Sequence, residues 1–172
     1  MLRILKFFAL AILITGFSAK AIAQVSATAT SSATIVTPIT IANQANMNFG
    51  NIAVNSSAGT VVLPAAAAPA RTVTGGCTLP ATAGTVSSAR FNVTGQTGYT
   101  YAITLPASAS LTGPGAPMTA NAFVSSPTVA LGGVLTGGAQ LLYVGATLNV
   151  GASQTAGAYT TGAAFTVTVN YN

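Results

Sequence analysis

The sequence contains no aspartate, no glutamate and no histidine among its 172 residues, and charged side chains make up only 3% of it. A typical globular protein is about a quarter charged. Without carboxylates or imidazoles the chain has no Ser-His-Asp triad, no catalytic carboxylate pair and no ordinary ligand set for zinc, calcium or magnesium. We therefore expect a protein that is not an enzyme, with no catalytic residue, no metal site and no cofactor.

Basic residues are also scarce. Lysine and arginine together number five, and Arg3, Lys6 and Lys20 all lie close to the N-terminus. The other two, Arg71 and Arg90, are far apart in the sequence, whereas nucleic-acid binding needs clustered cations that neutralise several phosphates. The basic character of the chain reflects missing acids rather than a basic patch, so we expect no nucleic-acid partner.

Residues 1–23 have the features of a secretory signal peptide. Two cations precede an apolar run over residues 7–14, which is too short to span a bilayer, and Ala21-Ile22-Ala23 supplies a small-x-small cleavage signal. An uncleaved membrane anchor is the alternative, and it fits less well because the apolar run ends at Thr15-Gly16. We expect export to the periplasm and on to the cell surface or medium, with no membrane span in the mature chain from Gln24.

Cys77 is the only cysteine in the sequence. It has no second thiol for an internal disulfide, and no histidine or lysine that could activate it lies nearby in the sequence. We expect a thiol without function, while an intermolecular disulfide is the alternative and a catalytic nucleophile is disfavoured.

Apolar and polar residues alternate along several stretches of the mature chain, and glycine-rich turns separate these stretches. Alternation with a period of two is typical of half-buried strands, and short strands at this spacing indicate an all-β fold, either a sandwich or a barrel. The last stretch is predicted to be a central strand of the core, with Ala163, Phe165, Val167, Val169 and Tyr171 facing inward. Strands are expected near 33–42, 48–54, 59–64, 70–75, 85–94, 98–105, 121–125, 128–131, 139–150 and 158–171.

Residues 24–32 are predicted to be an N-terminal extension that precedes a single domain over 33–172. Val25, Ala27 and Ala29 alternate with serine and threonine, but they bury too little apolar area to hold the segment in its own core. Its backbone is free to add as a strand to a neighbour's sheet edge. We expect the extension to be weakly ordered in an isolated subunit.

Several segments follow one another along the mature chain in an order that is fairly specific: Ile35–Ile41, Met47–Ile52, Arg71–Gly76, Arg90–Gly95, Tyr101–Pro106, Leu148–Gly151 with Gln154, Ala156–Tyr159 and Phe165–Asn172. Together they resemble one bacterial family, the DUF4402 domain, over nearly the whole mature chain. The resemblance implies no particular activity.

Two short motifs, Phe49-Gly50-Asn51-Ile52 and Ala156-Gly157-Ala158-Tyr159, are also similar to those of spore-coat-U-type and chaperone–usher pilin domains. This more distant resemblance implies an immunoglobulin-like antiparallel β-sandwich that assembles with itself or with related subunits. It also implies a periplasmic chaperone and an usher as partners. The chain differs from many pilins in that it lacks a cysteine pair.

The mature chain has no lysine with which to protect its sheet edges, and its low charge gives weak repulsion between molecules. These properties favour a secreted structural subunit of a surface fibre or coat that assembles by strand addition. The alternative is a monomeric binding module or adhesin that presents loops, such as residues 106–121, from a β-sandwich.

Overall fold

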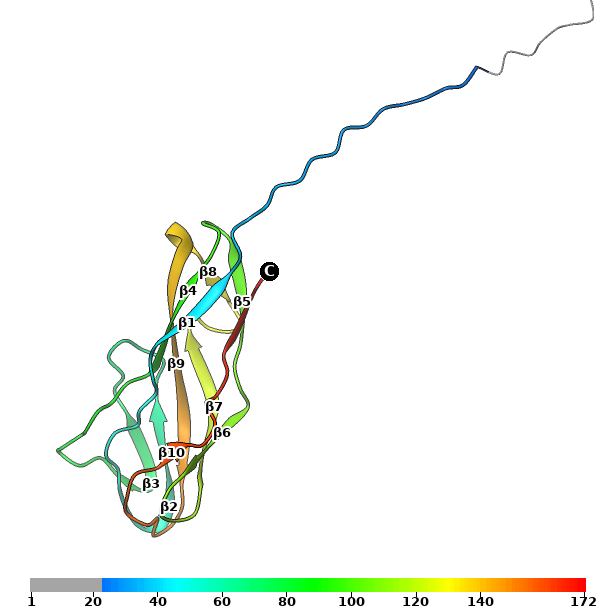
Figure 1. Cartoon of the computed structure of the whole chain (residues 1–172). Coiled ribbons are helices and arrows are strands. Elements are labelled where there is room, and N and C mark those ends of the chain that lie inside the picture. Colours follow the sequence, from blue (N-terminus) through cyan, green and yellow to red (C-terminus); the bar gives the residue numbers. More distant parts are fainter. Residues whose placement is uncertain (1–22) are drawn as a thin grey trace, which may run out of the picture. The chain divides into compact units, whose positions relative to one another are not determined.

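The computed structural model describes residues 23–172, so the predicted signal peptide lies outside the described residues apart from Ala23. The chain divides into two units, Met1–Thr34 and Ile35–Asn172. In the first unit, residues 23–34 contain no helix or strand, and all their side chains are exposed. Figure 1 shows the arrangement of the elements in the second unit.

The second unit is built from strands, with a single 3-10 turn, and no α-helix occurs within residues 23–172. This confirms the predicted all-β fold. The elements are β1 (Thr40–Ala45), β2 (Ala53–Leu63), β3 (Thr72–Thr78), β4 (Ala89–Thr94), β5 (Thr100–Thr104), β6 (Ser108–Thr112), β7 (Met118–Ser126), β8 (Gly133–Val134), η1 (Thr136–Gly138), β9 (Ala139–Val150), β10 (Thr160–Thr161) and β11 (Thr168–Tyr171).

The strands form two antiparallel sheets (Figure 1). The larger sheet has the order β1-β4-β9-β7-β6-β10, with β2 paired to β9 and β3 paired to β2, and the smaller sheet has the order β11-β5-β8. Strand β9 organises the larger sheet, because residues 139–144 pair with β4 while residues 146–150 pair with β2. Strand β7 runs along the opposite edge of β9.

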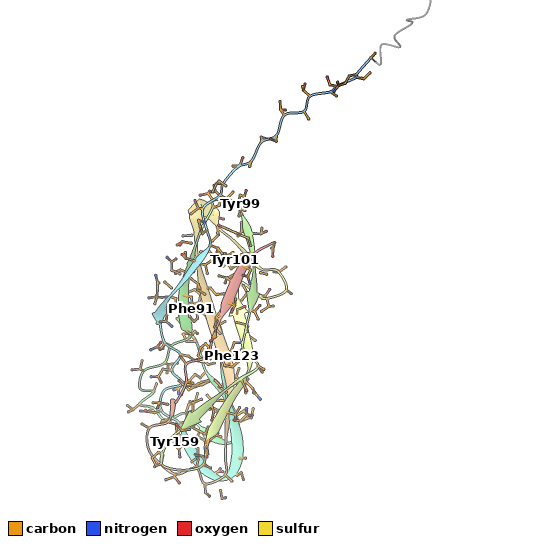
Figure 2. All side chains as sticks on the ribbon, turned by 45° about the vertical axis from the view of Figure 1, so that its right-hand side comes forward. Phe91, Tyr99, Tyr101, Phe123 and Tyr159 are labelled. Atoms are coloured by element: carbon orange, nitrogen blue, oxygen red, sulfur yellow. The ribbon has the colours of Figure 1, made fainter. Side chains whose placement is uncertain are left out.

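The core consists of two hydrophobic clusters that follow the length of β9. The first lies between the smaller sheet and the β4 side of the larger one, and it includes Val93, Tyr101 and Leu142. The second lies over β2, the end of β9 and the start of β7, and it includes Leu63 and Leu148. Figure 2 labels Tyr101 toward one end of the domain and Tyr159 toward the other. The smaller sheet covers the first cluster only.

The prediction of a strand over 33–42 is wrong for most of its length, because β1 begins at Thr40. Side chains rather than a neighbouring strand hold the preceding segment. The amide of Thr37 donates to Oε1 of Gln96 at 3.2 Å, and the hydroxyl of Tyr171 donates to the carbonyl oxygen of Thr37 at 2.7 Å. Pro38 has no amide hydrogen to offer a sheet.

The predicted loop over 106–121 is a hairpin instead, formed by β6 and the start of β7. The alternation in β6 escaped detection because the strand is five residues long and Leu111 is the one bulky apolar residue among its inward positions, Ala109 and Leu111. The strand predicted over 128–131 is a turn, in which the amides of Leu131 and Gly132 donate to the carbonyl oxygen of Thr128.

The predicted central strand over 158–171 is also corrected. The structure has two short strands here, and each has one neighbour, because β10 pairs with β6 and β11 pairs with β5. The chain crosses from the larger sheet to the smaller one between them, so no single partner strand follows it throughout. Ala163, which lies in this crossing, is exposed rather than inward-facing.

Candidate binding groove

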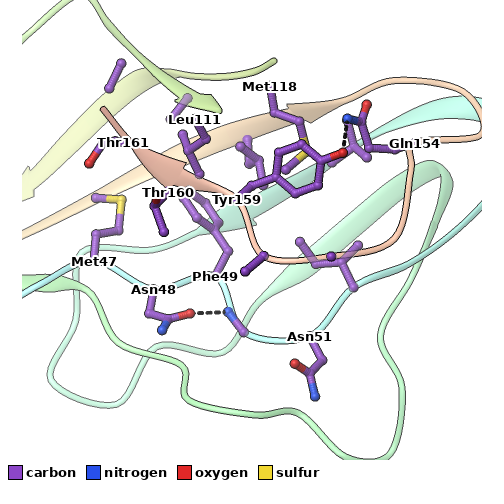
Figure 3. A pocket seen from close by; sticks show the side chains of 18 of the residues that line it. Met47, Asn48, Phe49, Asn51, Leu111, Met118, Gln154, Tyr159, Thr160 and Thr161 are labelled. Atoms are coloured by element: carbon purple, nitrogen blue, oxygen red, sulfur yellow. Dashed lines mark hydrogen bonds between the residues drawn. The ribbon is translucent and has the colours of Figure 1, made fainter. Parts of the chain in front are cut away.

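A cavity of about 1010 Å³ opens over the second hydrophobic cluster, in the part of the domain that the smaller sheet does not cover (Figure 3). Residues 46–54 form one wall, and residues 154–161 with Phe165 form the other. We call this cavity the edge groove. Its floor consists of side chains from β6, β7 and β9, namely Ala109, Leu111, Met118, Ala120, Phe123, Leu148 and Val150.

The edge groove continues toward β1 and β4 as a smaller hollow of about 80 Å³. The two spaces share Asn46, Met47, Thr161 and Phe165, so they follow one another along the same line between the walls. Phe165 also packs against Phe123, with ring centroids 5.2 Å apart. The cavity is therefore an elongated groove with aromatic side chains along it.

The first wall has its backbone partners on one side. The amide of Asn48 donates to the carbonyl oxygen of Ser87 at 2.8 Å, and the amide of Ser87 donates back to Asn48 at 3.0 Å. The amide of Asn51 donates to the carbonyl oxygen of Ala83 at 2.7 Å. Within residues 23–172, no strand pairs with the other side of this wall.

Arg71 fastens the first wall to the domain. Nη1 of its guanidinium donates to the carbonyl oxygen of Phe49 and, at 2.9 Å, to that of Asn51. Nη2 reaches the carbonyl oxygen of Ala83 at 3.5 Å. Between these contacts Gly50 has a φ of +67°, a conformation that side chains with a Cβ rarely adopt. The wall is thus a bent segment held by one cation.

Tyr159 fastens the second wall. Its hydroxyl donates to the carbonyl oxygen of Thr155 at 2.9 Å and accepts hydrogen bonds from the amide of Gly115 at 3.0 Å and from Nε2 of Gln154 at 2.8 Å. Nε2 of Gln154 also donates to the carbonyl oxygen of Ala116 at 2.6 Å. This network, visible in part in Figure 3, ties the loop before β10 to the turn between β6 and β7.

The groove lies between the two edges of the larger sheet, which have no neighbouring strand on the groove side within the described part of the chain. One edge is β1 with the wall that continues it, residues 46–54, which is irregular up to the start of β2 apart from a bridge at Asn48, and the other edge is β10. On their far sides the wall bonds to residues 83–87 and to β3, and β10 pairs with β6. The space between the two edges has an apolar floor.

No charged side chain lines the groove. Its polar groups are amides and hydroxyls, which include Asn46, Asn48, Asn51 and Thr160. Residues 23–172 hold no cluster of candidate metal ligands, and no helix in that range is long and apolar enough to cross a membrane. The groove therefore suits an uncharged occupant with apolar side chains and a backbone that can hydrogen bond.

The site residues predicted from the sequence have different environments. Val25, Ala27 and Ala29 are exposed in the segment 23–34. Phe165 lines the groove, whereas Val167 and Val169 are buried in the first cluster and Tyr171 packs against it. The groove itself was not predicted. The signal that could have located it is the pair of pilin-like motifs, because Phe49–Ile52 and Ala156–Tyr159 form its opposing walls.

Cys77 is 4% exposed and has no disulfide partner. Burial raises the pKa of its thiol, because a thiolate would lose its hydration there. Both features oppose reactivity.

A family described as "Domain of unknown function (DUF4402)" matches residues 39–171. The chain belongs to the DUF4402 family. No curated protein and no solved structure matches it. Both walls and the floor of the edge groove lie within the matched range, so the groove belongs to the DUF4402 domain, whereas the exposed segment 23–34 precedes it.

Proposed function

We propose that this DUF4402 protein is a secreted, non-catalytic structural subunit of a bacterial surface fibre or coat, and that its subunits join by strand addition in the edge groove. The observation that carries the proposal is the position of the groove, between two unpaired sheet edges and above an apolar floor.

An added strand satisfies both requirements of such a site. Its backbone supplies hydrogen-bond partners to both edges, and its alternate side chains cover the apolar floor. Soluble sheet proteins normally protect open edges with lysine, yet the sequence has no lysine after Lys20. An edge without such protection is better suited to pairing than to a monomer in solution.

The other features of the proposal come from the sequence. The signal peptide over 1–23 directs export, and the partners are copies of the same chain or related subunits. A periplasmic chaperone and an usher would cover the groove until assembly. The absence of aspartate, glutamate and histidine supports a role without catalysis.

The first test compares two tryptophan substitutions in the exported protein. Ala158 is exposed on the rim of the groove, so Ala158→Trp is expected to obstruct the groove without disturbing the core. Ala130→Trp, in the exposed turn after β7, is the matched control. Light scattering and electron microscopy should show polymers for wild type and Ala130→Trp and monomers for Ala158→Trp.

A deletion of residues 25–32 should likewise leave a folded monomer, because these side chains are exposed. The proposal is overturned if the wild-type protein stays monomeric at high concentration and is never found in fibres or coats on its native cells.

The size of the groove favours one alternative, a secreted binding module that holds a small apolar molecule. A volume of about 1010 Å³ is at the upper end of the range typical of ligand pockets. Native mass spectrometry of the exported protein separates the two functions. A constant added mass on a monomer supports a ligand, whereas a ladder of multiples of the chain mass supports a polymer.

A further inference from the structure

We infer that the occupant of the edge groove is residues 25–35 of a second copy of the chain, anchored by Ile35. This inference rests on the proposed function and deepens it, because it names the donor segment and the residue that holds it.

The first observation is the exposure of two bulky side chains at the ends of this segment. Val25 is 93% exposed and Ile35 is 94% exposed. Each of these side chains would gain apolar contact if the segment docked on an apolar surface. Leu131 is the other described example with comparable exposure, at 85%, and it lies in a turn.

The second observation is the phase of the segment. In an extended strand every second side chain points to the same face. One face of this segment combines a bulky residue at each end with small residues between them, and Ser31 is its one polar member. The residues on that face are Val25, Ala27, Ala29, Ser31, Ala33 and Ile35. The donor segment predicted from the sequence, 24–32, thus ends before Ile35, the bulkiest residue on this face.

The chemistry of the groove matches this pattern. Aromatic side chains, Phe49, Phe123 and Tyr159 among them, line the groove and offer apolar surface to the aliphatic side chains of the segment. Neither the groove nor the segment 24–35 carries a charged side chain, so no charged side chain loses its hydration on docking. In extended form residues 25–35 span about 36 Å, at about 3.3 Å per residue.

The anchor has to come from another copy. Hydrogen bonds to Gln96 and Tyr171 fix Thr37, and Ile35 is two residues away, within about 7 Å along the chain. The groove wall begins at Asn46, beyond β1, whose six residues extend for about 20 Å. Ile35 therefore cannot enter the groove of its own domain while Thr37 stays in place.

The test uses the full mature chain with Ile35→Ser, and with Leu131→Ser as the matched control. Both changes remove an exposed aliphatic side chain, so both variants should melt like wild type. Leu131→Ser should also assemble like wild type. Ile35→Ser should require at least a ten-fold higher protein concentration to assemble, as measured by light scattering, and Val25→Ser should have a smaller effect.

A synthetic peptide with the sequence of residues 24–36 provides a second measurement. It should bind the Ile35→Ser protein in a calorimetric titration, whereas the peptide with serine at the same position should bind at least ten-fold more weakly. The Ala158→Trp change in the recipient should abolish binding of both peptides.

The outcomes distinguish the two proposals. If Ile35→Ser assembles like wild type while Ala158→Trp blocks assembly, the anchor assignment is wrong and strand addition stands. If wild type does not assemble and the wild-type peptide does not bind, strand addition and the anchor both fail.

Discussion

Arg71 has no acidic side chain to pair with, because the chain contains none, and its guanidinium donates to backbone carbonyl oxygens instead. The planar guanidinium suits this role, since its fixed donors reach two carbonyl groups at once. The sequence could not predict this use of Arg71. It showed an isolated cation, and the segment that the cation holds lies about twenty positions earlier in the chain.

We predict that Arg71→Gln lowers the free energy of unfolding by about 2–3 kcal/mol, because hydrogen bonds from a charged donor to two carbonyl groups are lost. Arg71→Lys should recover only part of the loss, since an ammonium group lacks the planar geometry. Arg90→Gln is the control. Arg90 is exposed, so its replacement should change stability by less than about 0.5 kcal/mol. Urea denaturation measures all three, and equal losses at both arginines would contradict the role given to Arg71.

At the scale of the elements, alternation located strands that stay in one sheet along their whole length. The strand predicted over 139–150 is β9, and those predicted over 85–94 and 98–105 contain β4 and β5. Alternation failed where the chain changes sheets. The apolar residues from Phe165 to Tyr171 alternate as one strand does, but β10 and β11 belong to different sheets. A local pattern records which side chains turn inward, and it carries no information on which sheet supplies the hydrogen bonds.

The same distinction changes what is expected of Phe165. As a residue of a central strand its replacement by alanine would cost about 3–5 kcal/mol. Phe165 is instead half-buried on the groove wall, where it packs against Phe123. We predict a smaller loss for Phe165→Ala, about 1–2 kcal/mol, together with weaker assembly. Val169→Ala, which opens a space among fully packed neighbours in the first cluster, should destabilise the fold without this selective effect on assembly. Denaturation and light scattering on the same samples check both expectations.

At the scale of the whole molecule, the edge groove forms because two segments that are distant in the sequence face each other. Its two walls, residues 46–54 and 154–161, are about a hundred positions apart, and the sequence does not show that they face each other. The all-β class, the scarcity of charge and the open edges follow from composition and alternation. The missing strand does not, because it depends on how the larger sheet curves over the second cluster, which the smaller sheet does not cover.

The lack of acidic and imidazole side chains also determines how the whole molecule responds to pH. Stability depends on pH only where the folded and unfolded states bind different numbers of protons. The chain has no aspartate, glutamate or histidine, so apart from the chain termini nothing titrates between pH of about 4.5 and 7. We predict a melting temperature that is nearly constant from about pH 4.5 to about pH 8.

At alkaline pH two buried groups determine whether the stability of the fold rises or falls with increasing pH. Burial raises the pKa of the Cys77 thiol and of the Tyr101 hydroxyl above their ordinary values. In the unfolded chain these groups ionise near their ordinary pKa values, about 8.5 and 10. The folded state keeps them protonated, so their contribution to stability is complete below those values and is lost as the pH rises toward the folded-state pKa.

The melting temperature should therefore fall above pH of about 8.5. In Cys77→Ala the decline should begin nearer pH 10, whatever the starting stability of that variant. Differential scanning fluorimetry from pH 5 to pH 11 measures both curves, and a change of more than about 5 °C between pH 5 and pH 7 would contradict the prediction, because about 1 kcal/mol of linked protonation would then have no titrating group to account for it.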